Sequence, residues 1–210
     1  MATEDIAGVL KSPGETFRKI LASEEGLALP LAIVLANGLL SGISAYYQKL
    51  HALEQMKQMF AGAQAGALPF VQEPSLAAEV LRSLVLAPVG WVVFTAIILV
   101  LARLLGGRAG AKQFLAVNGY AQVPLIIGGA LGIAAGIFMP PLAMLPAFIF
   151  ALWSLAVLII GVREASGLST LRAAASVLVP VLILAVMLVA LFLGAMLALM
   201  VDGTPGQLPG

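Results

Sequence analysis

The chain has no cysteine among its 210 residues. Disulfide bonds, thiolate catalysis and cysteine-based metal sites are therefore excluded. Charge is also scarce, because Asp, Glu, Lys and Arg make up only 10% of the sequence, against roughly 25% in ordinary soluble domains. Hydrophobic residues account for 61% of the chain, which is more apolar surface than a water-soluble core can absorb. This composition predicts an integral membrane protein that is surrounded by membrane lipids.

Patterns for catalysis, metal binding and nucleic-acid binding are missing too. The only histidine, His51, has a single nearby acid, Glu54, which is too few ligands for a metal ion. Ser41 lies ten residues before His51, about 15 Å away along one helix, so the two cannot form a catalytic pair. The net charge is +1, and the eleven basic residues are scattered along the chain. We therefore predict no enzyme activity, no cofactor or metal, and no nucleic-acid partner.

Five apolar runs are each long enough to cross a bilayer, for which about 20 apolar residues suffice. They cover residues 27–48, 84–105, 114–138, 142–162 and 177–201. These runs predict an all-α fold, a polytopic bundle of five transmembrane helices, with residues 27–201 as the membrane domain and 202–210 as a flexible tail. The start of the chain is acidic and has no apolar run before Leu27, unlike a signal peptide, so we expect the first span to be retained as an anchor.

Residues 1–26 are expected to form a cytoplasmic segment with one short amphipathic helix. Ser12–Glu15 has the pattern of a capping box with proline at the first helical position. The helix that follows places Phe17, Ile20 and Leu21 on one side. Two arrangements suit this pattern: a helix lying at the membrane surface, or a helix docked against the bundle.

Residues 49–83 are predicted to form a helical hairpin outside the membrane. Its first arm continues the first span and keeps apolar residues at helical spacing, namely Leu50, Leu53, Met56 and Phe60. An apolar stripe of this kind needs a cover. We expect the cover to come either from Leu76 and Val80 on the second arm or from a second subunit, so a homo-oligomer is one of the arrangements left open.

The third span carries an unusual sequence for a helix that faces lipid. Asn118, Tyr120 and Gln122 lie in its first third, and Pro124 lies near its middle. Asn118 and Gln122 are four residues apart, so they share one helix face and need partners inside the protein. Pro124 deprives the carbonyl of Tyr120 of its intrahelical donor, which a side chain or a water molecule is expected to replace.

Small residues follow on the same span, where Gly128, Gly132 and Gly136 are spaced four apart. Such a stripe lets a neighbouring backbone approach closely, which promotes helix association in lipid. The first span offers a counterpart in Gly38 and Gly42. We therefore predict that these glycines form the contact between the first and third spans, and that the third span is the central helix of the bundle.

The polar residues that the spans do contain are uncharged, namely Asn37, Ser41, Ser44, Thr95, Asn118, Tyr120 and Gln122. Trp153 is the only large side chain of the fourth span with a polar group. Proton-coupled transport usually needs an ionisable group within the membrane, so hydrogen bonding between helices is the favoured interpretation. The alternative is a small-solute or ion pathway lined by the polar stripes of spans one and three. A continuous water-accessible cavity that reaches Asn37 or Asn118 would distinguish the two.

The distribution of Lys and Arg predicts the orientation in the membrane. The N-terminal segment and the links after the second and fourth spans hold eight basic residues, namely Lys11, Arg18, Lys19, Arg103, Arg108, Lys112, Arg163 and Arg172. The opposite side holds three, which are Lys49, Lys57 and Arg82. The positive-inside rule then places the N-terminus in the cytoplasm and the C-terminus outside the cell membrane.

Several short motifs along the chain are similar to those of one known family. In the third span, Gly119–Pro124 has the pattern GY-x-x-x-P, formed by Gly119, Tyr120 and Pro124. The other motifs are Leu104–Gly107 with Phe114, Trp153, Ile160–Glu164 (which includes Arg163 and Glu164) with Gly167–Ser169, and Ser12–Pro13 with Phe17–Ile20. In this order and with five spans, they resemble the Yip family, the Ypt/Rab-interacting membrane proteins.

The resemblance implies a non-enzymatic protein with a cytoplasmic N-terminus, which organises membranes or recruits a protein partner in membrane trafficking or membrane homeostasis. Eukaryotic members have long cytosolic N-terminal regions and act in vesicle traffic with small GTPases. Here the region before the first span has only about 26 residues, which favours a prokaryotic member. The N-terminal helix and the two basic links would then present the cytoplasmic face to a protein partner.

Overall fold

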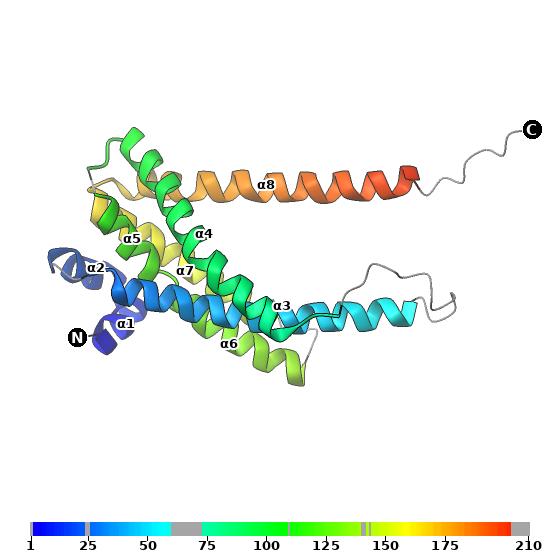
Figure 1. The fold of residues 1–210 in the computed structure, drawn as a ribbon. Helices are drawn as coiled ribbons and strands as arrows, with labels where there is room; N and C mark the ends of the chain where they lie inside the picture. The colour runs from blue at the N-terminus through cyan, green and yellow to red at the C-terminus, as the bar shows by residue number, and fades with distance from the viewer. Residues whose placement is uncertain are drawn as a thin grey trace, which may run out of the picture.

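Helices make up almost all of the residues that the computed structural model describes, which are 2–23, 26–59, 73–108, 110–139, 142 and 144–202. In chain order they are α1 (Ala2–Lys11), α2 (Pro13–Ala22), α3 (Ala28–Met59), α4 (Leu76–Leu104), α5 (Ala111–Tyr120), α6 (Val123–Phe138), α7 (Met144–Ser166) and α8 (Thr170–Asp202), as Figure 1 shows. Within these residues there is no β-strand. Five segments are long and apolar enough to cross a membrane: α3, α4, α5 with α6, α7, and α8. The prediction of an all-α polytopic membrane protein with five spans is confirmed.

The N-terminal segment contains two helices, where the sequence predicted one. The additional helix, α1, forms because Ile6, Val9 and Leu10 share one face, and Val9 is fully buried. α2 is docked against the bundle, since Phe17 is 0% exposed and its ring lies beside Gly161 of α7. Of the two arrangements considered for this helix, the structure has the docked one. We call the end of the bundle that α1 and α2 cover the capped end, and the opposite end the open end.

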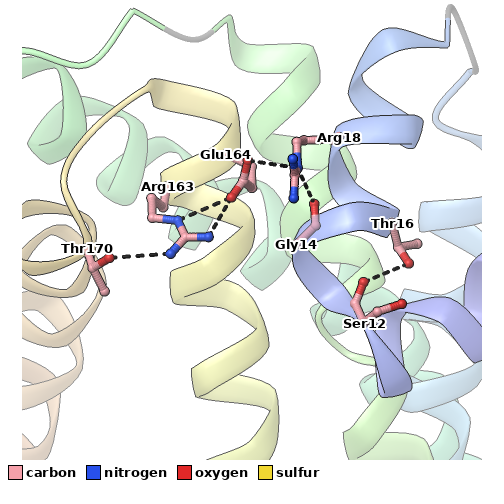
Figure 2. Close-up of polar contacts among 7 residues, drawn as sticks. All are labelled: Ser12, Gly14, Thr16, Arg18, Arg163, Glu164 and Thr170. Atoms are coloured by element: carbon pink, nitrogen blue, oxygen red, sulfur yellow. Dashed lines mark hydrogen bonds and ion pairs between the residues drawn. The ribbon is translucent and has the colours of Figure 1, made fainter.

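The expected capping box at Ser12 is absent. The Ser12 side chain makes no cap hydrogen bond, although Pro13 does occupy the first helical position. Instead, Thr16 Oγ1 donates a hydrogen bond of 3.0 Å to the Ser12 carbonyl (Figure 2). The Ser12 carbonyl thus accepts two hydrogen bonds from Thr16, one from its hydroxyl and one from its backbone N–H, at the start of α2.

Small residues determine how α3 packs on α4. A Cβ added to Gly38 would lie 2.9 Å from the Ala87 Cβ, and one added to Gly42 would lie 2.7 Å from the Val80 Cα. The prediction that these glycines meet the third span is therefore wrong, because the backbone that approaches them belongs to α4. Lys49 Nζ and Glu79 Oε1, 2.5 Å apart, continue the contact beyond the glycines.

The glycine stripe of the third span also has a different neighbour. A Cβ on Gly128 would lie 2.5 Å from the Phe150 Cβ, so Gly128 faces α7 and not α3. The glycine that does face α3 is Gly129, one position on, whose added Cβ would lie 3.8 Å from the Leu40 Cβ. Because consecutive residues point about 100° apart on a helix, the stripe at four-residue spacing and the contact with α3 lie on different faces.

The third span is two helices and not one. α5 ends at Tyr120 and α6 begins at Val123, with a turn at Ala121 and Gln122 between them. Pro124 explains the new start, because proline lacks the backbone donor and is favoured in the first turn of a helix. Gly119, just before the break, lets α5 reach the start of α3: an added Cβ would lie 2.6 Å from the Pro30 Cβ.

The predicted hairpin falls partly outside the described residues, as does Phe60. In the part that is described, α3 continues to Met59, and Leu53 is buried. Leu76 on the second arm is exposed, and Val80 packs against Gly42, so a cover for the apolar stripe from this arm, its neighbours or a second subunit stays a prediction.

The buried core lies toward the capped end. Buried apolar side chains from α2, α4, α5, α7 and α8 meet there, among them Phe17, Ile98, Phe114, Val162 and Val177. Toward the open end α3 stays packed on α4, whereas Figure 1 shows α8 running apart from α3 and α6. Every side chain of α8 from 182 to 198 is exposed. The bundle is therefore closed at one end and open to lipid at the other.

Candidate functional site

A cavity of about 630 Å³ lies among α3, α4, α5, α6, α7 and α8, on the open-end side of the core. On α4 it extends from Arg82 to Phe94, and it opens to the surroundings. Its polar lining consists of Asn37, Ser41, Arg82, Ser83, Trp91, Asn118, Gln122 and Ser154. Apolar side chains such as Leu86 and Leu125 complete the wall. Four residues that the sequence marked as polar candidates, Asn37, Ser41, Asn118 and Gln122, thus line one space.

Asn37 and Gln122 join α3 to the start of α6. Asn37 Nδ2 donates a hydrogen bond of 3.0 Å to Gln122 Oε1. Within the described part of the chain, the other amide atoms of this pair, Asn37 Oδ1 and Gln122 Nε2, have no hydrogen-bond partner. The pair therefore offers one acceptor and one donor to the cavity.

Asn118 joins α5 to α4. Its Nδ2 donates to Thr95 Oγ1 at 2.7 Å and to the Trp91 carbonyl at 3.4 Å, while Thr95 Oγ1 donates to the same carbonyl at 2.6 Å. The indole Nε1 of Trp91 donates in turn to the Leu115 carbonyl at 3.1 Å. Asn118 and Gln122, four residues apart, line the same cavity and bond to different helices, α4 and α3.

Ser154 of α7 contacts the break in the third span. Its Oγ donates a hydrogen bond of 2.6 Å to the carbonyl of Ala121, in the turn between α5 and α6. The sequence predicted that Pro124 would create a carbonyl in need of a donor, and it named the carbonyl of Tyr120. Because the helix ends and restarts here, the carbonyl that receives the side-chain donor is the one after Tyr120.

A second group of polar residues links the helix ends at the capped end. Figure 2 shows Glu164 of α7 between two arginines. Glu164 Oε1 accepts from Arg163 Nη2 at 2.6 Å, and Glu164 Oε2 lies 3.5 Å from Arg18 Nε of α2. Arg163 Nη1 also donates to Thr170 Oγ1 of α8 at 3.4 Å. Arg163 and Glu164 therefore connect α2, α7 and α8.

Further contacts extend this linkage. Asp5 of α1, with its side chain 3% exposed, pairs with Lys19 of α2 at 3.0 Å. The backbone N–H of Arg108 donates to the Ser166 carbonyl at 3.3 Å, and Arg172 Nη1 donates to the Leu105 carbonyl at 3.5 Å. The ends of α4, α7 and α8 are thus tied together at the face that α1 and α2 cover.

The remaining predicted residues have varied positions. Tyr120 is 1% exposed and Pro124 is buried, so both belong to the core. Trp153 is 45% exposed and lies away from the cavity, whereas Trp91 is 7% exposed and lines it. Gly132 and Gly136 are half-buried on α6.

Sequence reasoning did not select Trp91, Ser154, Glu79 or Asp5. The sequence does contain a signal for Trp91, because Trp91 and Thr95 are four residues apart and so share a helix face. Ser154 and Asp5 carry no such signal, since each has its partner in a distant segment, whereas Glu79 has a partner three residues on along α4, Arg82, as well as Lys49 of α3. In the described ranges, no three His, Cys, Asp or Glu side chains are grouped closely enough to hold a metal ion.

Most of the chain matches the model of a known protein family. Residues 7–192 match the Yip1 domain, a stretch that runs from α1 into α8. No curated protein and no solved structure gives a significant match.

Proposed function

Since the chain belongs to the Yip family of membrane proteins, we propose that it is a non-enzymatic membrane-organising or partner-recruiting protein of the cell membrane, acting in membrane trafficking or homeostasis. Membership of this family and the five apolar spans support the proposal. We propose that the capped end faces the cytoplasm and that a partner is recruited there.

The linkage of α1 and α2 to the bundle is the observation that carries this proposal. Phe17 fills the space beside Gly161, and Arg18 meets Glu164, so the N-terminal helices form a fixed surface over the helix ends. A fixed surface binds a partner without first losing conformational freedom. The capped end is therefore suited to recognition in a way that a mobile tail is not.

Charge at the capped end supports its proposed orientation and role. Seven exposed basic residues lie there, namely Lys11, Arg18, Lys19, Arg103, Arg108, Lys112 and Arg172. Basic residues favour the cytoplasmic side of a membrane. A basic side chain near the membrane attracts anionic headgroups or an acidic protein surface by about 1 kcal/mol. Glu4, Asp5, Glu15 and Glu164 lie at the same end and offset part of this attraction, with Asp5 and Glu164 paired to Lys19 and Arg18.

Site-specific crosslinking in native membranes tests the recruitment. A photo-crosslinking residue replaces Lys112 or Arg108 at the capped end, and Ser75 at the open end serves as control, all three being exposed. We expect a discrete protein adduct from the capped end only, with a mass twice that of the chain if the partner is a second copy. Adducts with lipid alone from both ends would contradict partner recruitment.

A reporter pair tests the orientation separately. Fusions placed after residue 23 and after residue 202 are expected on opposite sides of the membrane, the first in the cytoplasm. Finding both on one side would contradict the five-span topology.

A solute pathway is the second candidate, because the cavity reaches both Asn37 and Asn118. Between this cavity and the capped end lie Ile98, Val117 and Val162, each at most 1% exposed. A pathway would require this apolar layer to open. The chain has no native cysteine, so Ser41→Cys and Val117→Cys can be labelled singly with a membrane-impermeant thiol reagent. Labelling of both supports a pathway, and labelling of Ser41→Cys alone supports the closed arrangement.

A further inference from the structure

An apolar groove continues from the polar cavity between α4 and α8. It has a volume of about 590 Å³, and its walls include Ile97, Leu101, Val179, Ile183 and Met187. Phe94 lines both the cavity and the groove. On α8, Val181 lines the cavity, and its neighbour Pro180 lines the groove. The two spaces are therefore adjacent, one polar and one apolar.

The mouth of the cavity carries an excess of positive charge. Glu79, which is 8% exposed, pairs with Lys49 Nζ at 2.5 Å and also with Arg82. Two cations share one carboxylate, so the group has a net charge of +1. Arg82 lines the cavity, and its side chain is 54% exposed. A guanidinium has five N–H donors, so Arg82 can bind an anion while it remains paired with Glu79.

The order of charged, polar and apolar groups along α4 matches the order of such groups in one kind of molecule. From the open end inward it offers a cation at Arg82, then the unpaired amide atoms of Asn37 and Gln122, and then hydrocarbon beyond Phe94. Along the helix, Arg82 to Phe94, where the groove begins, spans about 18 Å at 1.5 Å per residue. One leaflet with its headgroups is about 20 Å thick.

From these features we infer that the cavity and groove bind one anionic glycerophospholipid from the leaflet at the open end. Its phosphate lies at Arg82, its glycerol and ester oxygens lie near Asn37 and Gln122, and one acyl chain follows the groove between α4 and α8. A purely apolar ligand would leave the amide atoms without partners, which is costly away from water. A water-soluble anion would leave the groove unfilled. This site is separate from the capped end and does not depend on recruitment there.

Two internal glycines supply a matched pair of variants to test this. An added Cβ meets nothing within 4 Å at Gly90, which lines the cavity, or at Gly194 on α8, which does not. Both Gly90→Leu and Gly194→Leu should fold, since there is open space around an added Cβ at each position and leucine improves helix propensity. Only Gly90→Leu places a side chain in the space proposed for the lipid.

The measurement is native mass spectrometry of the full chain. The protein is taken from vesicles of equal parts phosphatidylglycerol and phosphatidylcholine and is then delipidated stepwise. We expect one phosphatidylglycerol per chain to survive longest, with its retention at least fivefold lower in Gly90→Leu and unchanged in Gly194→Leu. Arg82→Gln should also lower it about fivefold, from the loss of one cation near a phosphate, while Lys57→Gln on the same side should not.

Three results would overturn the inference. Equal retention of the two lipids would remove the charge argument. If lipid retention fell equally in Gly90→Leu and Gly194→Leu, the cause would be a general effect on the detergent micelle. Undiminished retention in Gly90→Leu would place the lipid elsewhere.

Discussion

The Asn37 side chain of α3 donates a 3.0 Å hydrogen bond to Gln122, 85 positions later in the chain. The bond joins the first span to the break in the third. In lipid, where apolar packing gives little preference for one helix neighbour over another, a single amide pair of this kind helps to fix which helices meet.

Removing this pair is expected to have a small but measurable effect. Hydrogen bonds between membrane helices average about 0.6 kcal/mol in double-mutant cycles. Asn37→Ala, Gln122→Ala and the double variant should therefore show a coupling energy near that value, measured from unfolding in detergent. The corresponding double-mutant cycle for Gln48 and Ser44, an exposed pair within α3, should show a smaller coupling energy. A coupling of zero for Asn37 and Gln122 would mean that the two side chains do not bond in solution.

Overpacking at Gly42 should be costly. Its nearest neighbours are backbone atoms of α4, the Val80 Cα at 2.7 Å and the Glu79 carbonyl at 3.0 Å from an added Cβ. Backbone cannot move aside as a flexible side chain does, so Gly42→Leu is expected to destabilise the protein by about 1–3 kcal/mol. The melting temperature in detergent measures this effect. Gly194→Leu is the control, and an equal shift in both variants would contradict close packing of α3 on α4.

Ser154→Ala should weaken the break in the third span. The change removes the donor that reaches the Ala121 carbonyl at 2.6 Å, and an unsatisfied buried polar group costs about 1–3 kcal/mol. Ser41→Ala, at an exposed serine in the interior of α3, should be nearly neutral. Thermal unfolding compares the two, and hydrogen exchange at residues 117–126 should rise in Ser154→Ala only. If exchange there stays at the wild-type level, another group satisfies the carbonyl.

The docking of α2 should depend on packing far more than on charge. Phe17→Ala removes a fully buried ring, a change that costs roughly 3–5 kcal/mol in protein cores. Arg18→Ala removes the 3.5 Å pair with Glu164 and a 3.3 Å hydrogen bond to the Gly14 carbonyl within α2. The arginine side chain is 67% exposed, and exposed pairs contribute about 0–1 kcal/mol. Limited proteolysis should therefore cut within residues 2–23 much faster in Phe17→Ala than in Arg18→Ala. Equal rates would mean that the ion pair, and not the ring, holds α2.

The five spans could be predicted because each needs only enough apolar length, which is a local property of the sequence. Contacts between spans could not, because they depend on which face of each helix meets which neighbour. Gly38 and Gly42 indicated close approach correctly, yet a glycine does not identify the helix that approaches it. Their neighbour proved to be α4.

The polar residues show the same limit. Asn118 and Gln122 share a face on an unbroken helix, and Pro124 indicated a disturbance near them. The chain turns at Ala121 and Gln122, and the two side chains line the same cavity but bond to different helices. Trp91 and Trp153 lie in equally apolar surroundings in the sequence, and the four-residue spacing of Trp91 and Thr95 is the local feature that separates the buried indole from the exposed one.

The exposure of α8 beyond Pro180 has a consequence for how the protein responds to the thickness of its bilayer. The side chains of residues 182–198 are all exposed, and the last of them to line the groove with α4 is Met187. Pro180 also removes one backbone hydrogen bond at the point where α8 leaves the bundle. The apolar stretch from Val177 to Val201 is about 37 Å long, against a hydrocarbon core of about 30 Å, so α8 must tilt to bury it. We expect a thinner bilayer to increase that tilt while the capped end keeps its shape, and polarised infrared spectroscopy in bilayers of two thicknesses measures the change. The last span is thus free to adjust to the membrane, while the first four are held by one another.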